Sequence, residues 1–489
     1  MTPTVRNGTR RRRIAWGTAS LVALSLVGVA WTLASPVGSS PDDDFHLATI
    51  WCLADAPNLC RRTGRELEEG VERVLVVPAL GSGKPCFFMQ PEVSAACRVP
   101  AAEGSSLIPS RANDGLYPNG FYRLLAPFAS GNVDRSVVVM RMASWLLVQS
   151  LLFAALAVAG TQLRRAFALA FLVTLIPMGV FLFASTNPSG LAIAGVAVYW
   201  CATLTFLDRD HGRRAVAAAG LALLAASLAL GSRADAGLFL AVASVAAWIS
   251  GAGFHRPRRR SILPVSVGAV GLLLTAAGAG QSRRWAGELG IEEENSLAAK
   301  VFEALLDVPG RVLGSLGLSE LGWRDTPMPA LTSVLMLLAF GAAVALGLAV
   351  TTREKWFALA TVATATIALP MVVLVSGQNV HPRYLLPLLP VLAGTALVAP
   401  RGRAGIPITR GQATLVLSAV AVAHAAALHS TIRRYVTGID EGGPDLGEGR
   451  EWWWTTGPGP MAVWLLGSLA FGAAVVCGAF LVRDDQASA

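Results

Sequence analysis

The sequence predicts an all-α polytopic membrane protein with about twelve transmembrane helices, because apolar runs of roughly 20 residues recur along the chain. The composition supports this prediction. Of the 489 residues, 54% are hydrophobic and 15% are charged, against roughly 25% charged in soluble proteins. A chain this apolar cannot bury its hydrophobic residues in globular cores, so lipid must cover much of its surface. The net charge of +9 does not indicate nucleic-acid binding, because the basic residues form short clusters between apolar runs.

The apolar runs set the order of the elements. The predicted spans are 14–35, 136–160, 166–185, 189–207, 214–231, 235–251, 262–280, 329–350, 356–376, 383–399, 411–429 and 459–481. They divide the chain into a basic segment 1–13, the first span 14–35, a loop 36–135, spans two to seven in 136–280, a loop 281–328, spans eight to eleven in 329–429, a loop 430–458, and the last span with its tail in 459–489. The first run is longer than a signal-peptide core, which favours a retained helix over cleavage after it. Residues 214–251 fit either two full spans or a re-entrant pair.

The basic residues predict the orientation. If the N-terminus is cytoplasmic, the short outer loops carry only Arg233 and Arg383, whereas the inner loops are rich in arginine. This is the positive-inside asymmetry, so both termini are predicted to be cytoplasmic. The scarcity of lysine beside arginine, with much alanine and glycine, suggests a GC-rich bacterial genome and hence a bacterial plasma membrane. The inner basic residues are Arg164, Arg165, Arg209, Arg213, Arg214, Arg256, Arg258, Arg259, Arg260, Arg353, Lys355, Arg401, Arg403 and Arg410.

The long loop 36–135 is predicted to be a small α/β insertion outside the membrane, held by disulfides. It contains Cys52, Cys60, Cys86 and Cys97, and thiols on the oxidising side of a membrane are expected to pair. Proximity favours Cys52–Cys60 and Cys86–Cys97, although four cysteines allow three connectivities. The apolar segments 74–77 and 86–89, around a turn at 81–84, are typical of a short hairpin.

The second outer loop, 281–328, is predicted to contain an interfacial helix. Apolar residues recur at roughly helical spacing over 295–318, with charged residues between them. That pattern is typical of a helix that lies on the membrane surface with its apolar face in the lipid.

An acidic motif follows the first span. In Pro41-Asp42-Asp43-Asp44-Phe45-His46, a helix would bring Asp42 and Asp43 to the same face as His46. Two carboxylates beside an imidazole can act as a general base, bind a divalent cation such as Mg²⁺ or Mn²⁺, or bind a cationic group. The alternative is a solvated helix start, because proline and acids are common in a first helical turn.

Further polar residues gather at the predicted outer ends of the spans. Arginines there could bind a phosphate through paired hydrogen bonds, or could only anchor the spans at lipid headgroups. Tyrosines could line a site or belong to an interfacial aromatic belt, and Arg141 lies within an apolar run, where Asp42 or Asp43 could pair with it. The candidate binding residues are Tyr117, Tyr122, Arg141, Asn187, Arg233, Arg324, Asp325, His381, Arg383 and Tyr384.

These motifs resemble, in order and topology, a bacterial membrane-protein family known as domain of unknown function 2142. That family is similar in layout to the GT-C superfamily of membrane glycosyltransferases, which take a sugar from a polyprenyl-phosphate carrier and hold the base in the first outer loop. By this resemblance Asp42 or Asp43 deprotonates the acceptor hydroxyl, and Arg383, with Arg324 or Arg233, stabilises the leaving phosphate. The matching motifs are Pro41-Asp42-Asp43-x-x-His46, Tyr117-Pro118-x-x-Phe121-Tyr122, Asn187-Pro188-Ser189, Gly322-Trp323-x-Asp325-Thr326-x-x-Pro329 and Arg383-Tyr384-Leu385-Leu386-Pro387.

The resemblance therefore implies a GT-C-like enzyme that moves a sugar, with inversion, from a polyprenyl-phosphate donor to a glycan, lipid or protein of the cell envelope. Its partners would be membrane lipid, donor and acceptor, with no nucleic acid. One alternative is a non-enzymatic transporter of lipid-linked sugars or polymers, which would use the same arginines without a base. Ionisable residues are rare inside the spans, which disfavours it. Another is a structural subunit of an envelope-assembly complex.

Overall fold

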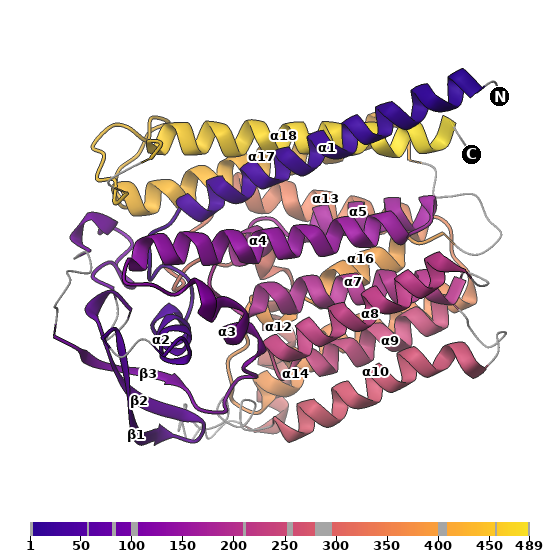
Figure 1. Cartoon of the computed structure of the whole chain (residues 1–489). Helices are drawn as coiled ribbons and strands as arrows, with labels where there is room; N and C mark the ends of the chain where they lie inside the picture. Colours follow the sequence, from indigo (N-terminus) through magenta and orange to yellow (C-terminus); the bar gives the residue numbers. More distant parts are fainter. Residues whose placement is uncertain are drawn as a thin grey trace.

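The protein is a bundle of apolar helices with a small mixed domain at one end (Figure 1). The computed structural model describes residues 3–55, 58–80, 85–98, 106–208, 212–251, 258–278, 296–399, 408–454 and 457–487. Within these residues, nine helices are long and apolar enough to cross a membrane. They are α1 (Pro3–Leu33), α4 (Val133–Val158), α7 (Ser189–Asp208), α8 (Arg213–Ser232), α10 (Arg258–Ala277), α13 (Ala330–Leu348), α14 (Arg353–Val375), α17 (Arg410–Val436) and α18 (Pro460–Ala487).

The other three predicted spans are also helical, but they are shorter or interrupted. The segment 235–251 forms α9 (Ala236–Gly251), which has 16 residues. The segments 166–185 and 383–399 are each broken next to a proline, Pro177 and Pro387, because proline lacks the amide hydrogen that a continuous helix needs. The resulting pieces are α5 (Thr161–Thr174), α6 (Met178–Phe183), α15 (Pro382–Leu385) and α16 (Leu388–Leu397). α5, α9 and α16 run alongside the long helices in the bundle.

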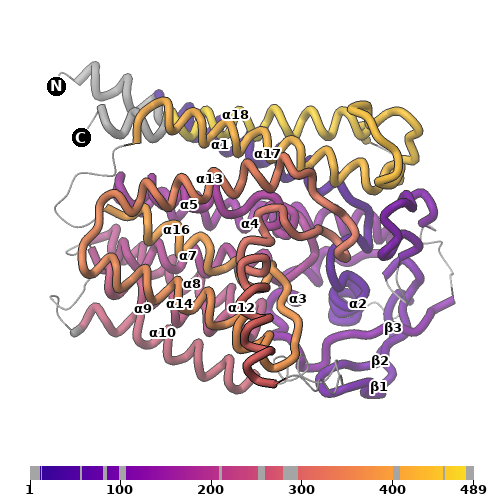
Figure 2. Tube along the Cα trace, turned by 180° about the vertical axis from the view of Figure 1, so that it is seen from behind, coloured from indigo at the N-terminus to yellow at the C-terminus, as the bar shows by residue number. Residues whose placement is uncertain are grey.

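α7 is the centre of the bundle. It is apolar on all sides, and nearly every residue from Ser189 to Leu207 is buried, as expected for a helix surrounded by others. It packs against α4, α8 and α9 (Figure 2). Small residues allow the close approach of α8: a Cβ atom at Gly195 would lie 2.7 Å from the carbonyl oxygen of Ala225. An alanine at this position would therefore push the two helices apart.

Several helices begin with an arginine at the same end of the bundle. Both chain termini lie at one end, and the small domain lies at the other (Figure 1). α8, α10, α14 and α17 each begin with an arginine at the end where the termini lie. The predicted inner residues Arg209, Arg256, Arg401 and Arg403 lie outside the described residues. The described arginines thus follow the asymmetry that the sequence predicts.

The small domain consists of a three-stranded antiparallel sheet and a helix. The strands are β1 (Cys60–Glu68), β2 (Val71–Val76) and β3 (Ile108–Asn113), in the order β1-β2-β3. α2 (Asp43–Leu53) packs mainly against β3, and α3 (Gly120–Leu125) contacts α2 and α8. Short 3-10 helices lie at Pro78–Leu80, Ala95–Cys97, Ala126–Phe128 and Gly314–Leu316.

One part of the predicted insertion is wrong. Segment 74–77 does contribute to a strand, but 86–89 forms turns and does not pair with it. β2 instead pairs with β1 and with β3, which follows some thirty residues later. The predicted turn at 81–84 lies outside the described residues. Local hydrophobicity alone could not identify the correct partner strands.

Both predicted disulfides are present. Cys52–Cys60 joins the end of α2 to the start of β1, with Cα atoms 5.1 Å apart, and Cys86–Cys97 closes a neighbouring loop, with Cα atoms 6.1 Å apart. Cys201 and Cys477 are free and buried. The crosslinks therefore lie in the small domain, at one end of the bundle.

Removing the Cys86–Cys97 disulfide with a double serine substitution should lower the free energy of unfolding by about 2–3 kcal/mol, because a short covalent loop restricts the unfolded chain. A denaturant titration of the purified protein, followed by tryptophan fluorescence, measures this change. The matched control is Cys201→Ser, which leaves both crosslinks intact. Alkylation before reduction should modify none of the four paired thiols, and four reactive thiols would contradict the assignment.

The predicted surface helix is present as α12 (Leu297–Leu313). It runs across the bundle helices instead of along them (Figure 2). One face is strongly apolar and exposed, and the opposite side contacts α14 and α15. This arrangement fits a helix that lies in the plane of a membrane. The exposed apolar residues are Leu297, Val301, Phe302, Leu305 and Leu306.

Candidate functional site

The acidic motif lies at the start of α2, at the end of the bundle opposite the termini. Asp42 occupies the N-cap position but has a left-handed backbone conformation, with φ of 60°, and its side chain makes no capping hydrogen bond. Asp and Asn tolerate this conformation better than most residues. The carboxylate is therefore not used to start the helix, which argues against the simple capping interpretation of the motif.

The three consecutive acids face three different arginines. Arg383 donates a hydrogen bond to Asp42, with 2.9 Å between Nη2 and Oδ2. Asp44 accepts two hydrogen bonds from Arg111, at 2.9 and 3.2 Å. Asp43 turns inward, where Nη2 of Arg141 lies 3.8 Å from Oδ2. The helix start thus gives each acid a different nearest arginine, although Arg111 also lies 3.8 Å from Asp42.

Asp43 is a structural residue in this arrangement. Its side chain is completely buried, whereas that of Asp42 is 33% exposed. It accepts hydrogen bonds from Oγ1 of Thr186 at 2.5 Å and from the amide of Ser40 at 3.1 Å. These partners enclose the carboxylate of Asp43. Of the two acids that the sequence offers as a base, Asp42 is therefore the more accessible.

A cavity of about 230 Å³ lies beside this motif, between α6, α15 and the end of α12. Its lining combines three arginines, one glutamate and several apolar side chains. It includes the predicted residues Arg324, His381 and Arg383. The remaining lining residues are Pro41, Met178, Phe181, Leu182, Arg311, Leu318, Ser319, Glu320, Leu321, Gly322 and Pro382.

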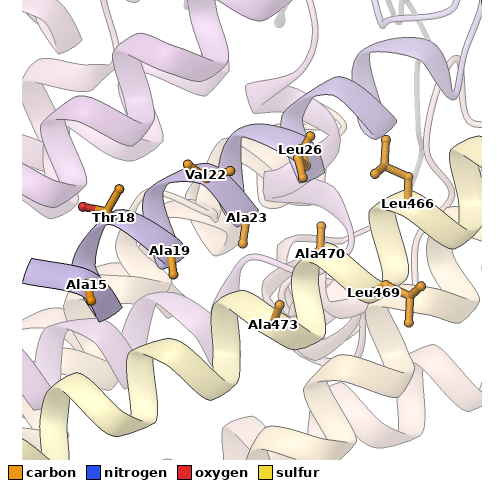
Figure 3. Close-up of a pocket in the computed structure, with 10 residues that line it drawn as sticks. All are labelled: Ala15, Thr18, Ala19, Val22, Ala23, Leu26, Leu466, Leu469, Ala470 and Ala473. Carbon is orange, nitrogen blue, oxygen red and sulfur yellow. The ribbon is translucent and has the colours of Figure 1, made fainter. Parts of the chain in front are cut away.

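A second cavity is larger but carries no charge. It measures about 830 Å³ and lies between α1 and α18 (Figure 3). Ten residues line it, and all but Thr18 are alanine, valine or leucine. Such a lining offers no group for binding an anion or moving a proton. Of these two cavities, only the smaller one is lined by ionisable side chains.

Electrostatics keep Asp42 ionised. Burial alone would raise its pKa, but the guanidinium of Arg383, together with that of Arg111, brings the pKa below its ordinary value. For Asp43 burial prevails, and its pKa is raised despite Arg141. Burial lowers the pKa of His46 to about 3, so its imidazole is neutral at physiological pH.

Aromatic rings lie around His46 and around Arg383, near the Asp42–Arg383 ion pair. Nδ1 of His46 lies 2.9 Å from the hydroxyl of Tyr122, and the ring of Tyr117 lies 5.6 Å from the imidazole. Tyr384 lies against two guanidiniums: the Arg383 and Arg233 carbons lie 5.0 and 4.8 Å from its ring centre. Cations at this distance are attracted to the face of an aromatic ring.

Arg233 forms an ion pair with Asp235 and contacts the site through the ring of Tyr384. It donates to both carboxylate oxygens of Asp235, at 2.8 and 2.5 Å, and to Ser189 at 3.3 Å. Asn187 also has a supporting position, because its side-chain amide donates to the carbonyl of Pro41 at 2.9 Å. Neither residue lines the cavity.

Two of the predicted binding residues lie elsewhere. Arg141 is fully buried and donates to the carbonyls of Thr32, Ser35 and Pro36 at the end of α1. Asp325 is buried against Arg434, with 3.0 Å between Oδ2 and Nη2. The structure therefore places both outside the cavity, in contacts that hold segments of the chain together.

Sequence reasoning missed three arginines that matter here. Arg311 lines the cavity and pairs with Asp307 one helical turn earlier, at 2.7 Å. That i, i+4 spacing on the amphipathic helix was a usable signal. Arg111 and Arg434 gave none, because their partners are distant in sequence.

The described residues contain no cluster of three or more His, Cys, Asp or Glu side chains that could hold a metal ion. Asp42 and Asp43, the predicted ligands, point toward different arginines.

The fold and this site define a multi-span α-helical membrane protein with a carboxylate–guanidinium pair beside a small basic cavity. Residues 24–392 match the family described as predicted membrane protein, DUF2142, and the chain belongs to that family. The match runs from α1 into α16, so it includes Asp42 and Arg383 and excludes α17 and α18. No curated protein and no solved structure matches the chain.

Proposed function

We propose that this protein is a GT-C-like glycosyltransferase that moves a sugar from a polyprenyl-phosphate donor to a cell-envelope acceptor on the outer face of a bacterial plasma membrane. The observation that carries the proposal is the 2.9 Å contact between Asp42 and Arg383 at the wall of the basic cavity. It brings a carboxylate base and a phosphate-binding group within reach of one substrate.

In the proposed reaction Asp42 takes the proton from the acceptor hydroxyl. The hydroxyl oxygen attacks the anomeric carbon, and the bond from that carbon to the phosphate oxygen breaks with inversion. The electron pair leaves with the lipid phosphate, whose developing charge is stabilised by Arg383 and Arg324. His46 and His381, both with pKa values lowered to about 3 by burial, stay neutral and do not compete for the proton.

The mixed lining of the cavity supports a lipid-linked donor. Arg311, Arg324 and Arg383 line it, and so do Met178 and Phe181 of α6. α12, which exposes an apolar face, ends at this cavity with Arg311. A phosphate headgroup could therefore bind the arginines while its isoprenoid chain stays in lipid.

The proposed topology has twelve spans with both termini in the cytoplasm, and α9, α5–α6 and α15–α16 complete the set. The charge at the termini end of the bundle supports this orientation. A fluorescent protein fused to the C-terminus should fluoresce, and alkaline phosphatase at the same position should be inactive. Alkaline phosphatase inserted after Glu69, in the turn between β1 and β2, is the control and should be active. The reverse pattern would contradict the orientation.

The function is tested with purified protein, polyprenyl-phosphate sugars and candidate acceptors. Release of polyprenyl phosphate that depends on an acceptor indicates transfer. A transporter of lipid-linked sugars would bind the donor but release no polyprenyl phosphate. Binding without turnover over a broad set of donors and acceptors would therefore favour the transporter.

A further inference from the structure

We infer that the Asp42–Arg383 ion pair is an autoinhibitory contact that the donor's phosphate opens. In this contact the base occupies the edge of the arginine that must bind phosphate, and binding of the phosphate releases the base. The inference rests on the proposed function and adds an order of substrate binding to it. The donor binds first, and Asp42 is free to act as a base only when the donor site is occupied.

The hydrogen bonds of Arg383 show how a phosphate and the carboxylate of Asp42 would compete for it. Its Nη2 atom donates to Asp42 at 2.9 Å and to the hydroxyl of Tyr384 at 3.0 Å. Both hydrogens of that nitrogen are therefore in use. Among the described residues, its Nε atom is buried and has no hydrogen-bond partner. A phosphate that accepts from both nitrogens would satisfy Nε and would compete with the carboxylate for Nη2.

The backbone and neighbours of Asp42 make the exchange reversible. Because the carboxylate does not cap α2, it can leave Arg383 without ending the helix. Nη2 of Arg111 lies 3.8 Å from its Oδ1 atom and remains as a cationic neighbour after the exchange. Arg111 is itself held by Asp44. The released carboxylate therefore stays ionised beside the bound donor, as a base must.

The size of the cavity supports the same conclusion. Its volume of about 230 Å³ is below the roughly 300–1,000 Å³ of typical ligand pockets. A phosphate headgroup fits this space more readily than a complete sugar phosphate. Asp42 does not itself line the cavity, but it holds Arg383, which does, and its withdrawal would free that side chain to make room for the sugar. Arg324, which lines the cavity, is another of the four described non-glycine residues with a left-handed backbone, with φ of 67°, and such conformations are frequent at functional sites.

The test is a binding measurement on the full-length protein in detergent micelles. Farnesyl phosphate is the probe, and farnesol, which has the same chain without the phosphate, is the reference ligand. Asp42→Asn removes the competing charge but tolerates the left-handed backbone. It should bind farnesyl phosphate about tenfold more tightly than the wild type, equivalent to roughly 1.4 kcal/mol. Asp42→Gly adopts the same backbone readily and should show the same direction of change.

The matched control is Asp134→Asn. It removes one acid at the same end of the bundle, paired with Arg98 and outside the cavity, and should leave the affinity unchanged. Equal affinity of the wild type and both Asp42 variants would overturn the autoinhibitory contact but not the proposed function. An equal gain in affinity for farnesyl phosphate in Asp134→Asn would also overturn the autoinhibitory contact, because the change in net charge would then explain the effect. If no protein prefers farnesyl phosphate to farnesol, the donor site itself is wrong.

Discussion

Replacing Asp42 with asparagine should lower the rate of sugar transfer by about 10²–10⁴-fold, because a positioned general base contributes that factor. The amide cannot accept the proton from the acceptor hydroxyl, but it keeps nearly the same shape. The melting temperature should therefore change little. Initial rates of acceptor-dependent polyprenyl phosphate release, measured for the wild type and the variant under saturating donor, give the ratio.

The pH dependence of the rate provides a second readout. The pKa of Asp42 lies below its ordinary value, so the base is deprotonated at neutral pH. At donor concentrations well below saturation, where the rate reports the free protein, it should stay constant as the pH falls toward about 5 and decline only near or below the usual aspartate value of about 4. The Asp134→Asn control should behave like the wild type. Unchanged turnover in Asp42→Asn would remove Asp42 as the base.

Replacing Arg434 with methionine should lower the free energy of unfolding by about 3–5 kcal/mol, because it leaves a buried charge without a partner. The side chains of Arg434 and Asp325 are 0% and 1% exposed. Arg434 also donates to the carbonyls of Val93 and Phe87 at 2.8 Å each, so it joins three outer segments. A denaturant titration in mixed micelles, followed by tryptophan fluorescence, measures the loss.

The neighbouring residue supplies the control. Arg433 donates to the carbonyls of Gly443 and Asp445 but pairs with no carboxylate among the described residues. Arg433→Met should therefore cost less than Arg434→Met. Adding Asp325→Asn to Arg434→Met should recover part of the loss, because the unpaired charge disappears. A double variant less stable than the single one would show that Asp325 has another essential partner.

The sequence predicted the class of fold because apolar runs and loop charges are local signals. It did not predict where helices break: Pro177 and Pro387 interrupt apolar runs that composition alone presents as continuous. The predicted hairpin between 74–77 and 86–89 is wrong for a related reason. The strand that contains 74–76 pairs with β3, which packs against α2 and lies some thirty residues later in the sequence, so a local pattern could not identify it.

The sequence identified most of the candidate site residues, but not which of them contact one another. Asp42 and Arg383 were both identified, yet 341 residues separate them, and only the folded chain shows that they touch. The same motif contained Asp42 and Asp43, and burial distinguishes them. Arg111 and Arg434 had no sequence signal, because a cation's role depends on the acid that it faces.

The Cys52–Cys60 crosslink ties the last turn of α2 to β1, and β3 holds the first turn of the same helix through Arg111 and Asp44. The geometry around Asp42 thus depends on a small domain whose covalent closure requires an oxidant. With the orientation proposed above, a newly synthesised chain would meet such an oxidant only after this loop has crossed the membrane, so the site would mature after translocation of the loop.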